Sequence, residues 1–155
     1  MIIIDVEASG LGPESYPIEV AWQHRYNHKL SDNFLIKPAA EWSHWNEYAE
    51  RHVHHIPQAL LVADGIEIEV ATNRLNTALK KQSVYSDAVE YDRRWLRKLF
   101  ASVGTEMDFQ VKSIFGLMHP AKVEAYHRYH SSRAKVHRAA DDVSAIVASL
   151  NYIAP

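Results

Sequence analysis

Five short apolar runs alternate along this chain with longer stretches in which apolar residues recur at helical spacing. Three of the runs precede the first helical stretch, and the other two lie between helices. Short apolar runs that end at turn-forming residues predict buried strands. The expected strands cover residues 2–6, 18–26, 33–36, 84–86 and 109–111. Three strands followed by alternating helices and strands indicate an α/β domain with a mixed sheet.

The helical stretches are marked by apolar residues that lie three or four positions apart. Five helices are expected, over residues 42–53, 68–79, 91–100, 121–129 and 139–151. Pro57 ends the first of these segments, because the residue before a proline avoids the helical conformation. Trp42 and Trp45 have helical spacing in that segment, so core packing is the favoured interpretation for both. Stacking on unpaired bases is the alternative.

Length and composition are those of one globular domain. The chain has 155 residues, of which 47% are hydrophobic and 23% charged, and we expect a single domain over residues 1–155. The sequence contains no cysteine, which excludes disulfides and thiolate metal ligands. No apolar run approaches the roughly 18 residues that span a bilayer. The first residues lack the basic region of a signal peptide, so we expect a cytoplasmic protein without a membrane partner.

Asp5 and Glu7 lie two positions apart on the first expected strand, so their carboxylates project from the same face. Two acids on one face repel each other unless a cation binds between them or one is protonated. Hard oxygen ligands of this kind suit Mg²⁺ or Mn²⁺. A solvated strand end is the alternative interpretation. The formal net charge of −2 argues against a bulk-charge binder of nucleic acid, but not against an enzyme that binds divalent cations.

A histidine and an aspartate flank the start of the last expected helix. His137 lies just ahead of that helix and Asp142 in its first turn, so both can face one site. A neutral imidazole there could accept a proton from an attacking water. The alternative is that Asp141 and Asp142 complement the positive end of the helix dipole. This alternative is favoured for Asp141 but not for Asp142.

Three motifs occur in an order that resembles one enzyme family. The first is the Asp-x-Glu segment with a following Gly-Leu, at residues 5–11. The second is the pair Tyr91-Asp92, which opens a helix, and the third is His137 with Asp142. Together they resemble the DEDDh group of 3′–5′ exonucleases, in the DnaQ-like family. The resemblance implies a ribonuclease H-like fold, with a mixed five-stranded sheet flanked by helices.

The resemblance also implies a role for each acid. Asp5 would bridge two divalent cations, Mg²⁺ or Mn²⁺, in a two-metal site. Glu7 and Asp142 would complete the site of one cation, and Asp92 would help to hold the other. His137 would be the general base. The substrate would be single-stranded DNA or short RNA with a free 3′ end, and the products would be nucleoside 5′-monophosphates.

Substrate contacts are implied for residues beside the motifs, namely Ala8, Ser9, Gly10, Leu11, Tyr91 and His55. His55-Ile56 is a partial match to the His-Gly-Ile that often precedes the middle helices of the family. Asp87 stands where the family often has asparagine, and Glu90 adds a further carboxylate near the expected site.

Two other functions stay open. One is a partner-dependent module, such as a proofreading subunit that docks on a polymerase. The other is a ribonuclease H-like endonuclease, which the spacing from His137 to Asp142 disfavours. Relatives of the family form dimers, so a homodimer is also compatible with the sequence.

Two groups of basic residues invite a competing interpretation. The four histidines His44, His52, His54 and His55 are interpreted as a solvated helix end rather than a zinc or nickel site. The basic stretch before His137, which includes Arg133 and Lys135, is interpreted as a wall of the substrate groove or a loop.

Overall fold

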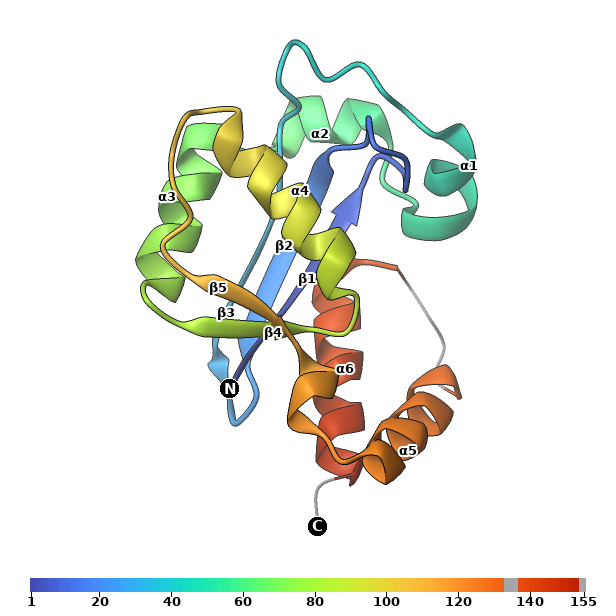
Figure 1. The fold of residues 1–155 in the computed structure, drawn as a ribbon. Helices are drawn as coiled ribbons and strands as arrows, with labels where there is room; N and C mark the ends of the chain where they lie inside the picture. Colours follow the sequence, from blue (N-terminus) through green and yellow to red (C-terminus); the bar gives the residue numbers. More distant parts are fainter. Residues whose placement is uncertain (133–136, 154–155) are drawn as a thin grey trace.

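The computed structural model describes residues 1–132 and 137–153. Its centre is a sheet in the order β3-β2-β1-β4-β5, built from β1 (Ile2–Ala8), β2 (Pro17–His24), β3 (Asn27–Leu35), β4 (Ser83–Ser86) and β5 (Gln110–Ser113). The first three strands pair antiparallel, whereas β4 pairs parallel with both β1 and β5. The mixed five-stranded sheet predicted from the sequence is therefore confirmed, with β1 at its centre (Figure 1).

Helices flank this sheet, as predicted (Figure 1). They are α1 (Glu47–Ala49), the π-helix η1 (Glu50–His54), α2 (Gln58–Asp64), α3 (Ile68–Leu79), α4 (Val89–Ala101), the 3₁₀ helix η2 (Ile114–Leu117), α5 (Pro120–Ser131) and α6 (Ala139–Ile153). Within the part of the chain that the structure describes, no helix has the length and apolar character needed to cross a membrane.

Alternation along β1 decides which side chains face which layer of helices. Ile4 and Val6 belong to the larger apolar core, which includes side chains of α3 and α4. Ile3 belongs to a smaller core with side chains of α5 and α6. Successive residues of a strand point to opposite faces. Asp5 and Glu7 therefore share the face of Ile3, against which α6 packs.

Strand β3 begins earlier than the sequence indicates. The expected strand covered residues 33–36, whereas β3 starts at Asn27. Its first five residues are exposed and all are polar except Leu30, as is usual where a strand forms the edge of a sheet. Such residues have no apolar pattern, because neither face of this part of the strand is buried.

The segment expected to form one helix over residues 42–53 is different in the structure. Trp42 and Trp45 precede α1, so the prediction of a helix there is wrong. Trp42 is buried and stacks on Tyr16 with ring centroids 5.1 Å apart, which confirms its packing in the core. The short helix α2 was not expected. Residues 59–63 are apolar without a break and Leu61 alone among them is buried, so the segment shows no helical period.

Candidate active site

Strand β1 holds two carboxylates against α6. Asp5 and Glu7 are both partly exposed, on the face that α6 covers. Desolvation, followed by the charges of Asp92, Glu7 and Asp142, raises the pKa of Asp5 well above its ordinary value. Burial and then Asp142 raise the pKa of Glu7 to about 8. The two strand acids therefore tend to hold protons wherever no cation compensates them.

A third carboxylate comes from the first turn of α4. Asp92 is 1% exposed, and the hydroxyl of Ser86 donates a hydrogen bond to its Oδ2. Its buried Oδ1 has no hydrogen-bond partner among the described residues. Burial raises the pKa of Asp92 to about 8, although the bond from Ser86 acts in the opposite direction. A buried acceptor atom without a hydrogen-bond partner destabilises the folded state unless a bound ligand interacts with it.

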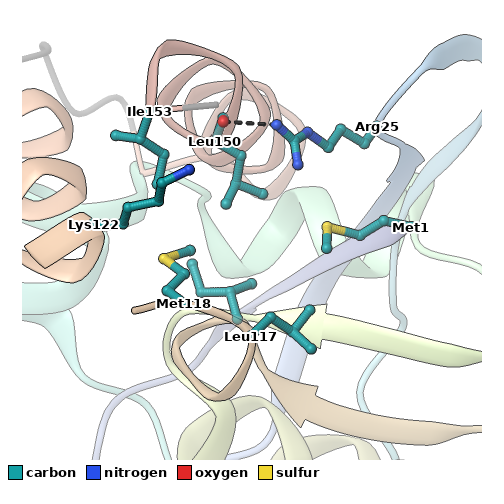
Figure 2. Close-up of a pocket in the computed structure, with 8 residues that line it drawn as sticks. Met1, Arg25, Leu117, Met118, Lys122, Leu150 and Ile153 are labelled. Carbon is teal, nitrogen blue, oxygen red and sulfur yellow. Dashed lines mark hydrogen bonds between the residues drawn. The ribbon is translucent and has the colours of Figure 1, made fainter. Parts of the chain in front are cut away.

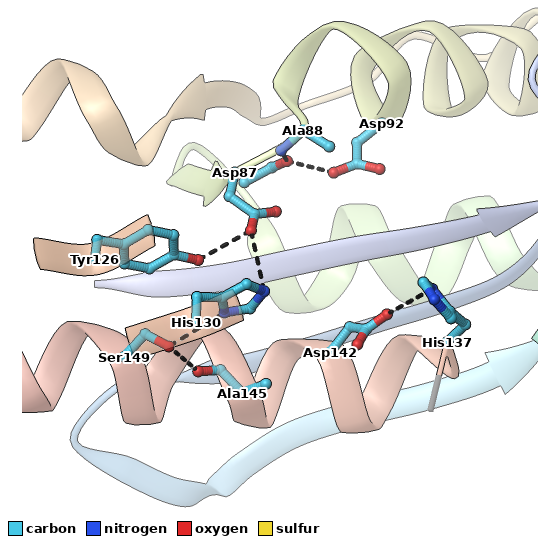
Figure 3. Close-up of polar contacts among 10 residues, drawn as sticks. Asp87, Ala88, Asp92, Tyr126, His130, His137, Asp142, Ala145 and Ser149 are labelled. Atoms are coloured by element: carbon cyan, nitrogen blue, oxygen red, sulfur yellow. Dashed lines mark hydrogen bonds and ion pairs between the residues drawn. The ribbon is translucent and has the colours of Figure 1, made fainter. Parts of the chain in front are cut away.

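The start of α6 brings a fourth carboxylate and the predicted base. Nδ1 of His137 lies 4.0 Å from Oδ2 of Asp142 (Figure 3). One ligand atom from each of Glu7, His137 and Asp142 lies within 4.8 Å of the other two. His137 has a left-handed backbone conformation, with φ of 52°. Carboxylate oxygens are the ligands that suit Mg²⁺ and Mn²⁺, so Glu7 and Asp142 fit the metal that the sequence implies.

A small pocket of about 90 Å³ joins these residues. Asp5, His137 and Asp142 line one part of it, and Asp87 and His130 line another. The pocket is thus walled by β1, by the loop that follows β4, and by α5 and α6. Two of the four predicted acids and the predicted base thus line one pocket, whereas Glu7 and Asp92 do not line it.

Asp87 is held by α5 rather than left open to solvent. The hydroxyl of Tyr126 donates to its Oδ2 at 2.9 Å, and Nε2 of His130 lies 3.8 Å from the same oxygen (Figure 3). Nδ1 of His130 is in turn 3.1 Å from Oγ of Ser149. Glu90 differs, because its exposed side chain pairs with Arg93 on the surface of α4. Asp87 thus adds negative charge to the pocket, whereas Glu90 points to solvent.

The residues predicted to contact substrate after β1 divide into two kinds. Ala8 and Ser9 are buried, and the Ser9 hydroxyl accepts from the N–H of Tyr16 and contacts Nδ1 of His44, each at 3.1 Å. Leu11 is 68% exposed. The side chains of Ala8 and Ser9 therefore fix the loop, while Leu11 is open to a ligand.

Tyr91 and Leu11 both contact Arg94, which places the two residues near each other. Tyr91 is 44% exposed. The guanidinium of Arg94 lies 5.2 Å from the centre of the Tyr91 ring, and its Nη2 donates to the carbonyl of Leu11 at 2.8 Å. An exposed aromatic ring and an exposed leucine thus border the end of β1 that carries the acids.

The histidine cluster needs a correction. His52 and His55 are exposed, as expected of a solvated helix end, but His54 is buried. Nδ1 of His54 accepts from the N–H of Ile56 at 3.0 Å, and burial lowers its pKa to about 4. His55 has a φ of 54°, in the region that favours glycine.

His54 is therefore the histidine held in the core of this segment, and His55 is the residue with a backbone conformation that favours glycine. Of the other basic residues, Arg128 pairs with Glu124 on the surface of α5, while Arg133 and Lys135 lie outside the described residues.

A second pocket lies at the other end of α6 (Figure 2). It has a volume of about 210 Å³ and apolar walls, apart from Arg25 and Lys122. Nη2 of Arg25 donates to the carbonyl of Leu150 at 2.7 Å. Among the described residues no carboxylate lines this pocket, so they offer no carboxylate ligand to a divalent cation there.

No family model and no curated protein sequence matches this chain. Among solved structures, the zinc-bound complex of Escherichia coli exonuclease I with single-stranded DNA is similar at 16% identity, with a TM-score of 0.74, over 96% of this chain and 39% of that one. Exonuclease I of Methylocaldum szegediense is similar at 13% identity, with a TM-score of 0.66, over 95% and 38%.

A viral exonuclease domain has the same fold over more of its length. The Mopeia virus domain is similar at 13% identity, with a TM-score of 0.54, over 98% of this chain and 74% of that one. At such identities the likeness shows the fold, which is the ribonuclease H-like fold of exonuclease domains. The chain spans about two fifths of the length of the exonuclease I structures.

Proposed function

We propose that this chain is a metal-dependent 3′–5′ exonuclease of the DEDDh group, acting on single-stranded DNA or short RNA. The observation that carries the proposal is the grouping of acids and His137 at the start of α6. Asp5, His137 and Asp142 line one pocket. Glu7 lies within 4.8 Å of His137 and Asp142, and the charge of Asp92 raises the pKa of Asp5. Solved exonucleases with this fold support the proposal, including exonuclease I in complex with a dT13 oligonucleotide. The whole chain, residues 1–155, would act as one cytoplasmic exonuclease domain.

The acids are assigned to two cations, Mg²⁺ or Mn²⁺. Asp5 would be shared by both, Glu7 and Asp142 would hold one, and Asp92 would help to hold the other through its unpaired oxygen. When bound, the two cations would stabilise the attacking and leaving oxygens of an in-line displacement. Oxygen ligands favour these hard cations over softer ones. The raised pKa values of Glu7 and Asp92, which arise mainly from burial, support the assignment, because a bound cation would favour the ionised form of a buried carboxylate.

His137 would act as the general base. Its Nδ1 faces Asp142, so Nε2 is the atom that would accept a proton from the attacking water. The left-handed backbone at His137 supports a functional role, because non-glycine residues in this conformation are uncommon. Proton transfer by a positioned side chain typically contributes about 10²- to 10⁴-fold to a rate.

The substrate would enter over the exposed residues beside the acids. Leu11 and Tyr91 would contact the terminal base, by apolar contact and by stacking. Backbone groups of residues 8–10 would contact the sugar and phosphate, since the side chains of Ala8 and Ser9 are buried. His55 would lie farther along the strand. Contacts of this kind do not read base edges, so modest sequence preference is expected.

The test is hydrolysis of single-stranded DNA and RNA of matched sequence, labelled at the 3′ or at the 5′ end. We expect a ladder that shortens from the 3′ end with Mn²⁺ or Mg²⁺, no cleavage with EDTA, and no cleavage by Asp5→Asn. Internal cleavage would indicate the endonuclease instead. Absence of cleavage by the isolated chain under every metal condition would contradict the proposal and favour the partner-dependent module.

A further inference from the structure

A buried glutamate and an arginine join β2 to the start of α6. Glu19 is 1% exposed, and Arg138 binds both of its carboxylate oxygens, with distances of 3.2 and 3.0 Å from Nε and 2.7 Å from Nη2. The N–H of Ala139 donates to the same carboxylate at 3.0 Å. One carboxylate thus holds both the arginine side chain and the first residue of α6. We call Glu19 and Arg138 the clamp.

The clamp lies directly beside the site. Glu19 is the cross-strand partner of Glu7, so the two side chains share the face of the sheet that α6 covers. A buried carboxylate opposite another acid is unfavourable unless a cation compensates it. Arg138 provides that charge, and its hydrogen bond to Glu19 is the largest influence that raises the pKa of the guanidinium.

Arg138 also lies between His137 and Asp142 in the sequence, and it is bonded to both through the backbone. His137 precedes it with a φ of 52°, and the N–H of Asp142 donates to the Arg138 carbonyl at 2.9 Å. Fixing the Arg138 side chain on β2 therefore fixes the direction of His137 and the first turn that carries Asp142. A bidentate arginine–carboxylate pair is suited to this task, because its two parallel bonds define an orientation as well as a distance.

We propose that Glu19 and Arg138 are positioning residues, which hold His137 over Glu7 and Asp142 in the geometry that the reaction needs. The inference rests on the proposed exonuclease function for its kinetic consequence. Its structural consequence, a fixed His137 ring, can be observed without any turnover. Misplacing a catalytic group by about 1 Å can lower a rate roughly 100-fold, so the clamp is expected to affect kcat more than KM.

The test compares Glu19→Gln and Arg138→Gln with Arg138→Lys and with a control, Arg74→Gln. Arg74 makes a bidentate pair with Asp32 between α3 and β3, away from the acids, so its loss controls for removal of an ion pair. Steady-state kinetics gives kcat and KM. NMR of ¹³Cε1-labelled histidine gives one ring signal for each of the ten histidines, and the His137 signal is the one that His137→Asn removes.

We expect kcat to fall about 10- to 100-fold in both glutamine variants, with KM changed less than about threefold. Arg138→Lys should keep part of kcat. Lysine keeps the positive charge but cannot donate the two parallel hydrogen bonds of a guanidinium to the Glu19 carboxylate. The His137 signal should shift in both glutamine variants and stay in place in Arg74→Gln. Removing Glu19 and removing Arg138 change the charge near Glu7 with opposite signs, so effects in the same direction identify positioning rather than electrostatics.

An unmoved His137 signal in the folded clamp variants would overturn the inference, as would effects of opposite sign in Glu19→Gln and Arg138→Gln. If Arg138→Gln does not fold, the Glu19→Gln and Arg138→Lys variants decide, since neither leaves a buried charge unpaired. If the wild-type chain has no nuclease activity, the proposed function fails, and the His137 signal alone then supports or refutes the clamp.

Discussion

Asp92 combines deep burial with an unpaired oxygen, and it is therefore the acid whose replacement is most informative. Asp92→Asn removes the charge but keeps an oxygen that the Ser86 hydroxyl can reach. We expect turnover to fall to background, and the melting temperature of the metal-free protein at pH 8 to rise, because a desolvated charge has been removed. Asp141→Asn is the matched control, since Asp141 is an exposed acid beside Asp142. Differential scanning fluorimetry and the nuclease assay measure the two effects. Near-normal turnover in Asp92→Asn would argue against the metal site.

Substitution of His137 provides a second test at the level of single residues. Asparagine tolerates the left-handed backbone better than most residues, so His137→Asn removes the imidazole without straining the chain. We expect kcat to fall about 10²- to 10⁴-fold, with KM changed less than about threefold. Single-turnover kinetics on a labelled oligonucleotide separates the chemical step from binding. Equal losses in kcat and in affinity would instead point to a structural role.

The acids and the base could be predicted from the sequence because each lies in a short local motif. Other site features could not. Glu19 and Arg138 are 119 positions apart, and their pairing exists only once β2 and α6 are packed. The left-handed conformation of His55 likewise follows from the chain path and not from residue type.

Among the elements, the loop between β1 and β2 is held from two sides. Lys98 of α4 donates to the carbonyls of Glu14 and Ser15, each at 2.9 Å. On the other side, a Cβ on Gly10 would lie 2.7 Å from Cε1 of His44, and Gly10 has a φ of 157°. The loop that presents Leu11 is therefore fixed by packing rather than by its own sequence.

Gly10→Ala should accordingly destabilise the protein. We expect a loss of about 1–3 kcal/mol, because both the backbone conformation and the contact with His44 are unfavourable. Gly12→Ala is the control, since no atom of the described residues lies within 4 Å of a Cβ built there. Urea denaturation gives the midpoints of both variants. Midpoints that agree within error would show that Gly10 is not required by this packing.

The elements whose apolar residues recur with a clear period were predicted correctly from the sequence. Helices α3, α4 and α6 and strands β1 and β4 occur where their apolar patterns place them. The segment from Trp42 to α1 was misread, because residues at helical spacing can also reach a core from irregular chain when one of them stacks on a partner such as Tyr16. Tertiary contacts override local pattern in such a segment.

For the molecule as a whole, the site predicts an unusual dependence of stability on pH. Glu7 and Asp92 have pKa values of about 8 in the folded protein, against ordinary values of 4.5 and 3.8. Between these limits the folded state binds more protons than the unfolded state, so the free energy of unfolding falls as pH rises. Thermal unfolding without metal should therefore give a melting temperature that decreases by several degrees from pH 5 to pH 8. Asp92→Asn should flatten this slope, and an unchanged slope would contradict the assigned cause.

If the acids of β1, α4 and α6 form one divalent-metal site, calorimetric titration of the metal-free protein with Mn²⁺ at pH 8 should detect it. We expect up to two bound ions per chain and a higher melting temperature when Mn²⁺ is present, since the metal binds the folded state. Asp5→Asn should lose this binding, whereas Asp32→Asn, which changes an acid on β3, should retain it. No measurable binding at millimolar Mn²⁺, or equal binding by wild type and Asp5→Asn, would show that these acids do not form a divalent-metal site.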